Sequence, residues 1–183
     1  MRADAARNRA LILDATRRLS DRNGAGDLRI AAVAREAGVG KATVIRRFGD
    51  KAGLISALLG EEERRLQERI VRGPPPLGPG APPVERAEEF LVALAKLYLR
   101  ELDLVHASET AGAGARYRVG AYAAWRQHLT MLATQANADV EPELAAHLLL
   151  SPLAAESLAE LRRTGRERAL PDGLRALARG LLS

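Results

Sequence analysis

The sequence contains no cysteine, and only 3% of its 183 residues are aromatic. The first absence excludes a disulfide framework, a Cys-ligated zinc site and a thiol nucleophile. The second, beside 47% hydrophobic residues, favours helices that pack through Leu and Ala over a β-rich fold. No alternating Val/Ile-rich run argues for a sheet. We therefore expect an all-α protein with one or two domains.

Long apolar runs are missing as well. The longest Leu-rich run, Ala145 to Leu150, is far too short to span a bilayer, and the amino-terminal stretch MRADAARNRALI is charged throughout. These features predict a soluble cytoplasmic protein.

The motifs of common enzyme classes are also absent: there is no Gly-rich phosphate loop after a strand, no nucleophile elbow and no HExxH. His106 with Glu109, and Glu143 with His147, have helical spacings, but the further ligands of a metal site in a helical bundle are lacking. We interpret both pairs as surface contacts. The sequence predicts no enzymatic activity, no catalytic residue, no metal and no cofactor.

Positive charge is concentrated in the first third of the chain. Residues 1–51 carry twelve Lys or Arg against six Asp or Glu, while the whole chain has a net charge of +5. All of the excess positive charge therefore lies in this segment. Such a basic region is typical of proteins that bind nucleic acid or another anionic surface, although a solvated basic face has the same composition.

A proline-rich segment divides the chain. Residues 73–83, GPPPLGPGAPP, contain six prolines and three glycines, a composition that excludes a helix or a central strand. We expect this linker to be extended or poorly ordered, between a module at 1–50 with its connecting helix at 51–72 and a longer helical module at 84–183.

Apolar spacing places the helices of the first module. It predicts a helix from about Ala6 to Arg22 and a short second helix from Ile30, which ends where Gly38 adopts a left-handed conformation. A third helix, residues 41–48, follows at once with Gly40 as N-cap. Two short helices joined by a tight glycine-containing turn form a helix-turn-helix motif. Asp50 caps a fourth helix, whose apolar stripe continues through Leu66 and Ile70; its distal half is expected to pack against the second module.

The third helix has two different faces. At 100° per residue, Val44 and Phe48 lie on one side, and the opposite side is small, hydroxylated and basic. A helix that enters the major groove needs these properties, because small residues allow close approach and Arg reaches guanine or phosphate. A solvated amphipathic helix would give the same projection, but the adjacent short helix and tight turn favour DNA binding.

The runs ILDATRRLSDRNG and IAAVAREAGVGKATVIRRFGDKAGLISALL resemble the tetracycline-repressor (TetR) family of bacterial transcriptional regulators over roughly the first 60 residues. The resemblance implies an all-helical homodimer: a helix-turn-helix DNA-binding domain at 1–50, and a domain at 84–183 that binds a small-molecule effector and dimerises through its last two helices. It also implies a ligand-responsive regulator, a repressor of a palindromic operator on double-stranded DNA. The alternative is a non-enzymatic helical interaction module whose basic end binds an anion.

The DNA contacts of the family map onto the third helix and its flanks. This sequence departs from the family at two positions, with Arg29 where many members have Thr and Ile45 where most have Tyr. Arg29 can reach a phosphate, and Ile45 can offer an apolar contact to a thymine methyl. Lys51 is the expected phosphate anchor, because a cation in the first turn of a helix opposes the helix dipole unless an anion lies nearby. The residues expected at DNA are Arg29, Gly40, Lys41, Ala42, Thr43, Ile45, Arg46, Arg47 and Lys51.

The second module offers weaker signals. Apolar spacing predicts helices at about 84–99, 117–135, 143–164 and 174–182, with a kink or break at Pro152. We expect a four-helix dimer interface formed by Leu149, Leu153, Leu158, Leu161, Leu174, Leu177 and Leu181. The candidate ligand-binding residues, taken as a group, are Tyr98, His106, Tyr117, Tyr122, Trp125 and His128, although for any one of them alone core packing or an exposed position is the better interpretation.

Overall fold

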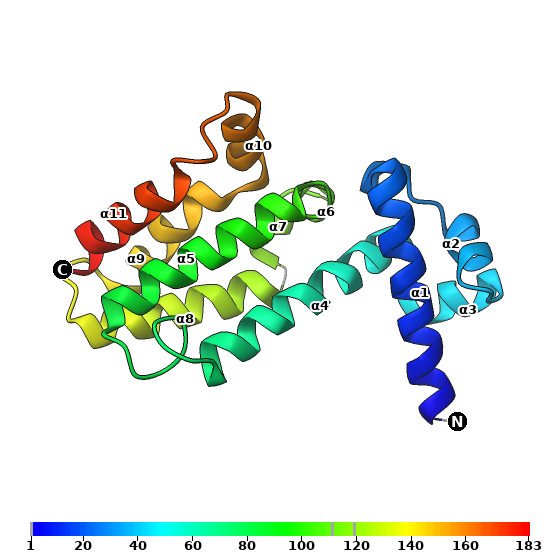
Figure 1. Cartoon of the computed structure of the whole chain (residues 1–183), viewed down its shortest axis with the longest axis horizontal. Coiled ribbons are helices and arrows are strands. Elements are labelled where there is room, and N and C mark those ends of the chain that lie inside the picture. Colours follow the sequence, from blue (N-terminus) through cyan, green and yellow to red (C-terminus); the bar gives the residue numbers. More distant parts are fainter. Residues whose placement is uncertain (1, 111, 119) are drawn as a thin grey trace. The chain divides into compact units, whose positions relative to one another are not determined.

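The computed structural model describes residues 2–110, 112–118 and 120–183, and none of these residues lies in a β-strand. The all-α fold expected from the composition is confirmed (Figure 1). The helices are α1 (Arg2–Asn23), α2 (Ile30–Glu36), α3 (Lys41–Phe48), α4 (Lys51–Arg72), α5 (Pro83–Arg100), α6 (Leu102–Glu109), α7 (Ala115–Arg118), α8 (Gly120–Ala136), α9 (Pro142–Leu150), α10 (Ala155–Arg163) and α11 (Leu170–Leu182), with the 3-10 turns η1 (Ala25–Asp27) and η2 (Ser151–Leu153).

The chain forms two compact units. The amino-terminal unit consists of residues 1–61 and 103–113, and the carboxy-terminal unit of residues 62–102 and 114–183. This division differs from the expected boundaries in two ways. Helix α4 contributes one half to each unit, and residues 103–113, which precede α8 in the chain, belong to the amino-terminal unit because Leu104 lies in its core.

The core of the amino-terminal unit contains the apolar residues that the helical spacing singled out. Ile12, Ala15, Val33 and Val44 are fully buried. Thr16 is also fully buried, and its hydroxyl donates to the Ile12 carbonyl oxygen at 2.7 Å, so the core contains no unsatisfied polar group at this position. Helices α1, α2 and α3, the first half of α4 and Leu104 of α6 therefore form one small core.

The carboxy-terminal unit is built around α5, which packs against both α8 and α11, while α8 packs against α9 (Figure 1). The buried face of α5 includes Phe90, Leu91 and Leu94, none of which is exposed. The second half of α4 belongs to the same unit, and its Leu66 and Ile70 are each only 4% exposed. The expectation that the distal half of α4 packs within the second module is confirmed.

The helix expected at about 143–164 is broken at Pro152, where a kink or break was predicted. Helix α9 ends at Leu150, a 3-10 turn follows, and α10 continues in a direction 41° away. Arg116 donates to the carbonyl oxygens of Leu150 (2.7 Å) and Leu153 (3.1 Å), which lie at the break. Among the described residues no single helix is long and apolar enough to cross a membrane, and only the bent pair on either side of this break has the necessary length and composition.

The proline-rich segment is a compact turn, and the expectation of an extended or poorly ordered linker is wrong. Leu77 is only 8% exposed, and the Gly78 amide donates to the Pro74 carbonyl oxygen at 3.0 Å. A Cβ atom on Gly78 would overlap the carbonyl of Gly73. Prolines that fix φ, a glycine at the closest approach and one buried leucine therefore give the segment a defined shape.

The expected dimer interface is wrong for most of its residues. Leu149, Leu153, Leu158 and Leu174 are at most 1% exposed within a single chain, so these side chains fill the core of their own subunit. The spacing of the leucines on the last helices shows that one helix face is apolar, but not whether that face packs against the same subunit or against a partner. On α9 the exposed large apolar residues are instead Leu144 and Leu148, which are 50% and 43% exposed.

Candidate nucleic-acid interface

The turn between α2 and α3 has the geometry that its glycines predict. Gly38 has a φ of 66°, and the amide of Val39 donates back to the Ala34 carbonyl oxygen at 3.0 Å, which ends α2. Gly40 then adopts an extended conformation, and its carbonyl oxygen accepts the Thr43 amide at 2.9 Å, which starts α3. The helix-turn-helix motif expected from the sequence is present with the expected boundaries.

Helix α3 is anchored by one face and exposed on the other. Val44 is fully buried, and Phe48 packs at the edge of the same core. Of the six expected DNA-contact residues on α3, five are exposed and Thr43 is partly buried; the exposed residues are Lys41, Ala42, Ile45, Arg46 and Arg47. Ile45 is 44% exposed, so the outer face carries one bare apolar side chain among its cations.

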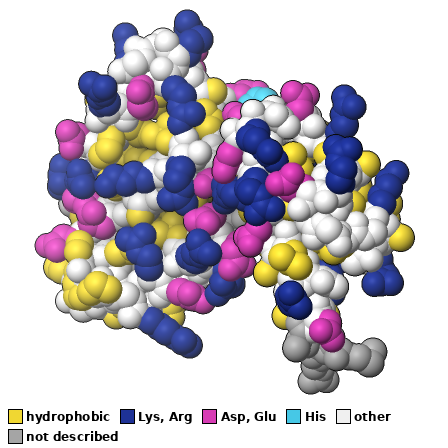
Figure 2. Space-filling model, turned by 45° about the vertical axis from the view of Figure 1, so that its right-hand side comes forward, with side chains coloured by type: hydrophobic (Ala, Val, Ile, Leu, Met, Phe, Trp, Pro, Cys, Tyr) yellow, Lys and Arg dark blue, Asp and Glu magenta, His cyan; other side chains and the backbone are white. Residues whose placement is uncertain are grey.

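The positive charge of this unit is divided into two groups. Arg18 and Arg22 of α1 bind Glu36 at the end of α2, at 3.0 and 3.1 Å, and their hydrogen bonds, with that from Arg18 the stronger, hold the pKa of Glu36 below its usual range. These pairs tie α1 to α2. By contrast, within the described part of the chain no ion pair involves the expected DNA-contact cations Arg29, Lys41, Arg46 and Arg47. Lys and Arg side chains project from the outer edge of this unit (Figure 2).

Arg29 and Lys51 lie on either side of the motif. Arg29 is the exposed N-cap of α2, and its side chain makes no capping hydrogen bond. Lys51 is partly buried, and its ammonium donates to the carbonyl oxygen of Gly26 in the η1 turn. This contact was not predicted; it offers Lys51 a fixed acceptor at the start of α4, and two of its N–H groups are left for a phosphate. Asp50 caps α4 as predicted, with its Oδ1 accepting the Gly53 amide at 2.9 Å.

Gly53 fixes the angle at which α3 meets α4, and the sequence interpretation gave it no role. A Cβ atom at this position would lie well inside van der Waals contact with the carbonyl oxygen of Phe48, which ends α3. The start of α4 therefore approaches the backbone of α3 as closely as a residue without a side chain allows. The signal that could have identified it is its place three residues after the N-cap Asp50.

The six candidate ligand-binding residues separate into three locations. Trp125 and His128 pack against Phe90, whose ring is 5.5 Å from that of Trp125 and 5.0 Å from that of His128, and Tyr98 adjoins this cluster through Trp125. The Trp125 indole donates to the Tyr98 hydroxyl at 3.2 Å, and that hydroxyl donates to Glu63 at 3.4 Å. Burial, followed by the nearby Arg86, lowers the pKa of His128 to about 4, so this imidazole is neutral.

The other three candidates are apart from that cluster. Tyr122 is buried between α8 and α9, where its hydroxyl lies 2.8 Å from Nδ1 of His147, and Tyr117 is 63% exposed with its ring against that of Tyr122. His106 is exposed and belongs to the amino-terminal unit. A cavity of about 600 Å³ in the carboxy-terminal unit is lined by none of the six. Their assignment to a ligand site stays a prediction.

Metal-binding groups are not assembled in the described part of the chain: no three His, Asp or Glu side chains there lie close enough to hold a metal ion. Of the two His/carboxylate pairs of the sequence, the second has other partners: Glu143 forms an ion pair with Arg126, and His147 contacts Tyr122.

A helix-turn-helix with an exposed, basic second helix, followed by a larger helical unit, defines a DNA-binding protein of the transcription-regulator class. Residues 12–58 match the family of bacterial regulatory proteins, tetR family. The match covers the helix-turn-helix and the start of α4, and it assigns this part of the chain to the family. No curated protein sequence matches the chain.

Solved structures show that the likeness in fold extends over almost the whole chain. A putative TetR-family transcriptional regulator from Rhodococcus sp. is 19% identical, with 97% of this chain and 100% of the other covered and a TM-score of 0.73. A putative transcriptional regulator from Saccharomonospora viridis in complex with choline is 23% identical (96% and 95% covered, TM-score 0.63). NalD, the secondary repressor of the MexAB-OprM multidrug efflux pump in Pseudomonas aeruginosa, is 19% identical (98% of both covered, TM-score 0.62).

Proposed function

We propose that the chain is a ligand-responsive transcriptional repressor that binds a palindromic operator as a homodimer. The observation that carries the proposal is the outer face of α3, which is exposed and whose cations have no ion-pair partner among the described residues. A protein that regulates transcription works where the DNA is, and we place this one in the cytoplasm.

Each residue of the motif has a specific role in this proposal. Helix α3 enters the major groove, where Arg46 and Arg47 bind guanine edges or phosphates and Ile45 contacts a thymine methyl. Arg29 and Lys51 bind phosphates on either side and fix the register without reading sequence. The small side chain of Ala42 allows α3 to approach the bases closely, and the hydroxyl of Thr43 donates to a phosphate or a base edge.

The response to a ligand is assigned to the carboxy-terminal unit. The choline complex of the Saccharomonospora viridis protein and the description of NalD as a repressor support a small-molecule effector and repression. Helix α4 is one helix whose halves belong to different units, so it offers a covalent route between them. A ligand that binds one conformation of the dimer more tightly than another would increase the population of that conformation. If the two α3 helices are separated differently in it, they no longer fit successive major grooves, and the affinity for DNA falls.

The proposal is tested by selecting duplexes from a random library and measuring competition. A specific regulator retains its selected operator in the presence of a large excess of unrelated duplex. The alternative, a helical module with an anion-binding basic end, predicts that unrelated duplex or heparin competes as well as the operator. That result would remove the proposed function.

The contacts of α3 give a direct prediction. Arg46→Ala and Arg47→Ala are each expected to weaken operator binding by about 1–3 kcal/mol, or roughly ten- to a hundredfold, because each removes a charge-assisted contact to a base or phosphate. Fluorescence anisotropy with labelled operator measures the change. Arg168→Ala, which removes an exposed arginine of the carboxy-terminal unit, serves as control and should leave affinity unchanged. Equal affinities for all three variants would contradict the docking of α3.

Dimerisation is assigned to the exposed face of α9. Leu144 and Leu148 are one helical turn apart and exposed, so they present adjacent apolar side chains that a second copy could cover. Changing both to Arg is expected to give a monomer in sedimentation experiments at micromolar concentration, and to weaken binding to a full operator far more than to a half-site. Val71→Arg, at another exposed apolar position, is the control. A double variant that remains dimeric would place the interface elsewhere.

A further inference from the structure

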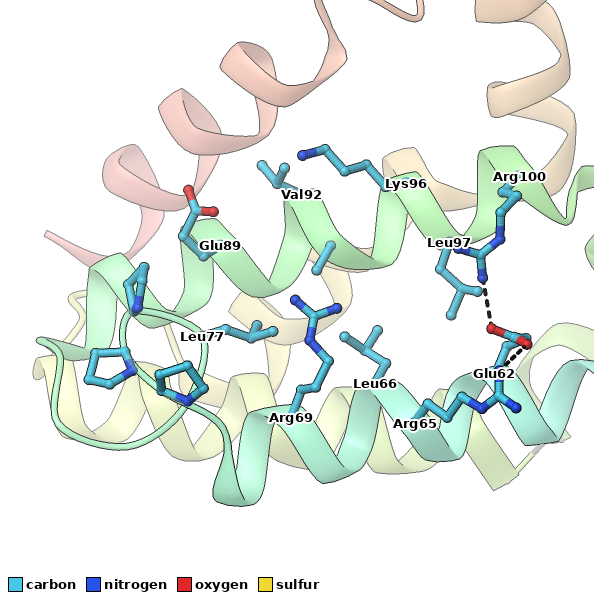
Figure 3. Close-up of a pocket in the computed structure, with 14 residues that line it drawn as sticks. Glu62, Arg65, Leu66, Arg69, Leu77, Glu89, Val92, Lys96, Leu97 and Arg100 are labelled. Atoms are coloured by element: carbon cyan, nitrogen blue, oxygen red, sulfur yellow. Dashed lines mark hydrogen bonds and ion pairs between the residues drawn. The ribbon is translucent and has the colours of Figure 1, made fainter.

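The cavity of about 600 Å³ lies in the carboxy-terminal unit, where side chains of α4, the proline-rich turn and α5 line it (Figure 3). Its volume is within the range of small-molecule sites. It is separate from the aromatic cluster around Phe90, because none of the six aromatic and histidine candidates contributes to its lining.

The inner wall of the cavity is apolar. Leu66 of α4, Leu77 of the proline-rich turn, and Val92 and Leu97 of α5 all line it, although each is at most 8% exposed. These side chains come from three separate segments and converge on one space (Figure 3). An apolar group placed there would be removed from water without any rearrangement of the core.

The proline-rich turn forms one side of the cavity as a preformed wall. Pro74, Pro75 and Pro76 line it together with Leu77, and the Gly73 amide donates to the carbonyl oxygen of Arg69 at 2.8 Å. Because the bond from the Gly78 amide to the Pro74 carbonyl oxygen closes the turn and its prolines fix φ, little conformational entropy remains to be lost when a ligand binds.

The charges on the cavity are unbalanced. Glu62 already binds both Arg65 (3.0 Å) and Arg100 (2.8 Å), and these pairs are marked in Figure 3. The other carboxylate of the lining, Glu89, binds Arg175 at 2.9 Å. Both acidic groups are therefore neutralised.

Two cations of the lining remain. For Arg69 and Lys96, no ion pair exists within the residues that the structure describes. Arg69 extends from α4 between Leu66 and Leu77, toward α5, and Lys96 extends along α5 toward Val92 (Figure 3). An excess of positive charge therefore adjoins an apolar wall.

We propose that this cavity is the effector site and that it binds an amphipathic carboxylate. The carboxylate pairs with Arg69, whose planar guanidinium can bind both of its oxygens, while Lys96 adds positive potential. The apolar body lies on Leu66, Leu77 and Leu97. A cationic ligand would meet the excess positive charge, and a small inorganic anion would leave the apolar wall uncovered. The assignment of this cavity as the effector site rests on the proposed function.

The test uses decanoate as the probe and isothermal titration calorimetry on the full chain without DNA. Decanoate should bind saturably. Hexanoate, with four fewer methylenes, should bind roughly two hundredfold more weakly, since each buried methylene contributes about 0.8 kcal/mol. Decyltrimethylammonium, with the opposite charge, should not bind at the same concentrations.

Two matched variants locate the probe. Arg69→Gln should weaken decanoate binding about tenfold or more, whereas Arg72→Gln, an exposed arginine on the same last turn of α4 that does not line the cavity, should leave it unchanged. Lys96→Gln should weaken binding less. Tyr122→Phe, in the other group of candidates, should bind like the unchanged protein. Fluorescence of Trp125 during unfolding checks that each variant is folded.

The outcomes separate the cavity from the proposed function. Saturable binding that depends on Arg69, and a lower operator affinity when decanoate is bound, support the inference. The inference is overturned if decanoate shows no saturable binding, if Arg69→Gln and Arg72→Gln have equal effects, or if Tyr122→Phe alone loses binding. It is also overturned if decanoate binding depends on Arg69 but leaves operator affinity unchanged. Failure of the proposed function appears differently, as a wild-type chain that does not distinguish operator from unrelated duplex; the titration without DNA still decides whether the cavity binds the carboxylate.

Discussion

Replacing Gly53 with alanine is expected to weaken operator binding more than a hundredfold while the carboxy-terminal unit stays folded. The new Cβ would overlap the carbonyl oxygen of Phe48, and a backbone atom cannot rotate away as the end of a side chain can. Overpacking typically costs about 1–3 kcal/mol and occasionally more, which is a large share of the stability of a small domain. The least costly relaxation is a shift of α3 relative to α4, which moves the DNA-binding face.

The same helix supplies a matched control. A Cβ on Gly60 of α4 would meet nothing within 4 Å, so Gly60→Ala should be neutral or should stabilise the chain by up to about 1 kcal/mol. Operator anisotropy gives the affinities, and Trp125, the only tryptophan, reports separately on the carboxy-terminal unit. If the two alanine variants bind operator equally well, the close approach at Gly53 does not set the position of α3.

The helix-turn-helix could be predicted from sequence because its signals are local. Gly38, Gly40 and Asp50 each determine a helix end through the conformation or hydrogen bond of that same residue, and the structure places all three as expected. The outward face of α3 follows from its period alone once Val44 is assigned to the core. No knowledge of the rest of the chain was needed.

Features that depend on distant segments could not be predicted. Helix α6 was missed, and the burial of its Leu104 in the amino-terminal unit depends on a contact with residues far away in the chain. The proline-rich segment was interpreted as a flexible tether because Pro and Gly are as common in a tight turn as in a linker; only the buried Leu77 distinguishes the two. The cavity requires this turn, α4 and α5 together.

The burial of leucines was ambiguous for a related reason. An apolar stripe on α9 or α11 indicates that a face is covered, but not whether the covering surface belongs to the same chain. Leu149 and Leu174 are covered by their own subunit, and the exposed Leu144 and Leu148 carry no sequence signal that separates them from their neighbours. The same ambiguity applies to Tyr98 and Trp125, since an aromatic residue that fills a core and one that lines a pocket have the same spacing.

Replacing Glu63 with glutamine is expected to stabilise the carboxy-terminal unit by about 2–3 kcal/mol at pH 8 and to have almost no effect at pH 4. Glu63 is partly buried on α4, and burial raises its pKa to about 7, while the hydrogen bond from Tyr98 acts in the opposite direction. Between its unfolded pKa of about 4.5 and its folded pKa of about 7, the folded chain holds a proton that the unfolded chain releases. The stability of the wild-type protein therefore falls as pH rises through this interval, and the full cost remains above it.

Glutamine removes this cost because its neutral amide keeps an oxygen for the Tyr98 hydroxyl and never ionises. His128, whose folded pKa of about 4 makes stability fall as pH drops below about 6.5, would distort the pH profile of either protein alone, but it is common to both and cancels in their difference. Denaturant unfolding followed by Trp125 fluorescence at pH 4, 6 and 8 measures that difference. Glu68→Gln, at an exposed glutamate on the same helix, should show no such growth with pH. If Glu63→Gln raises the free energy of unfolding by the same amount at all three pH values, the difference in stability comes from packing and not from the charge of a buried carboxylate.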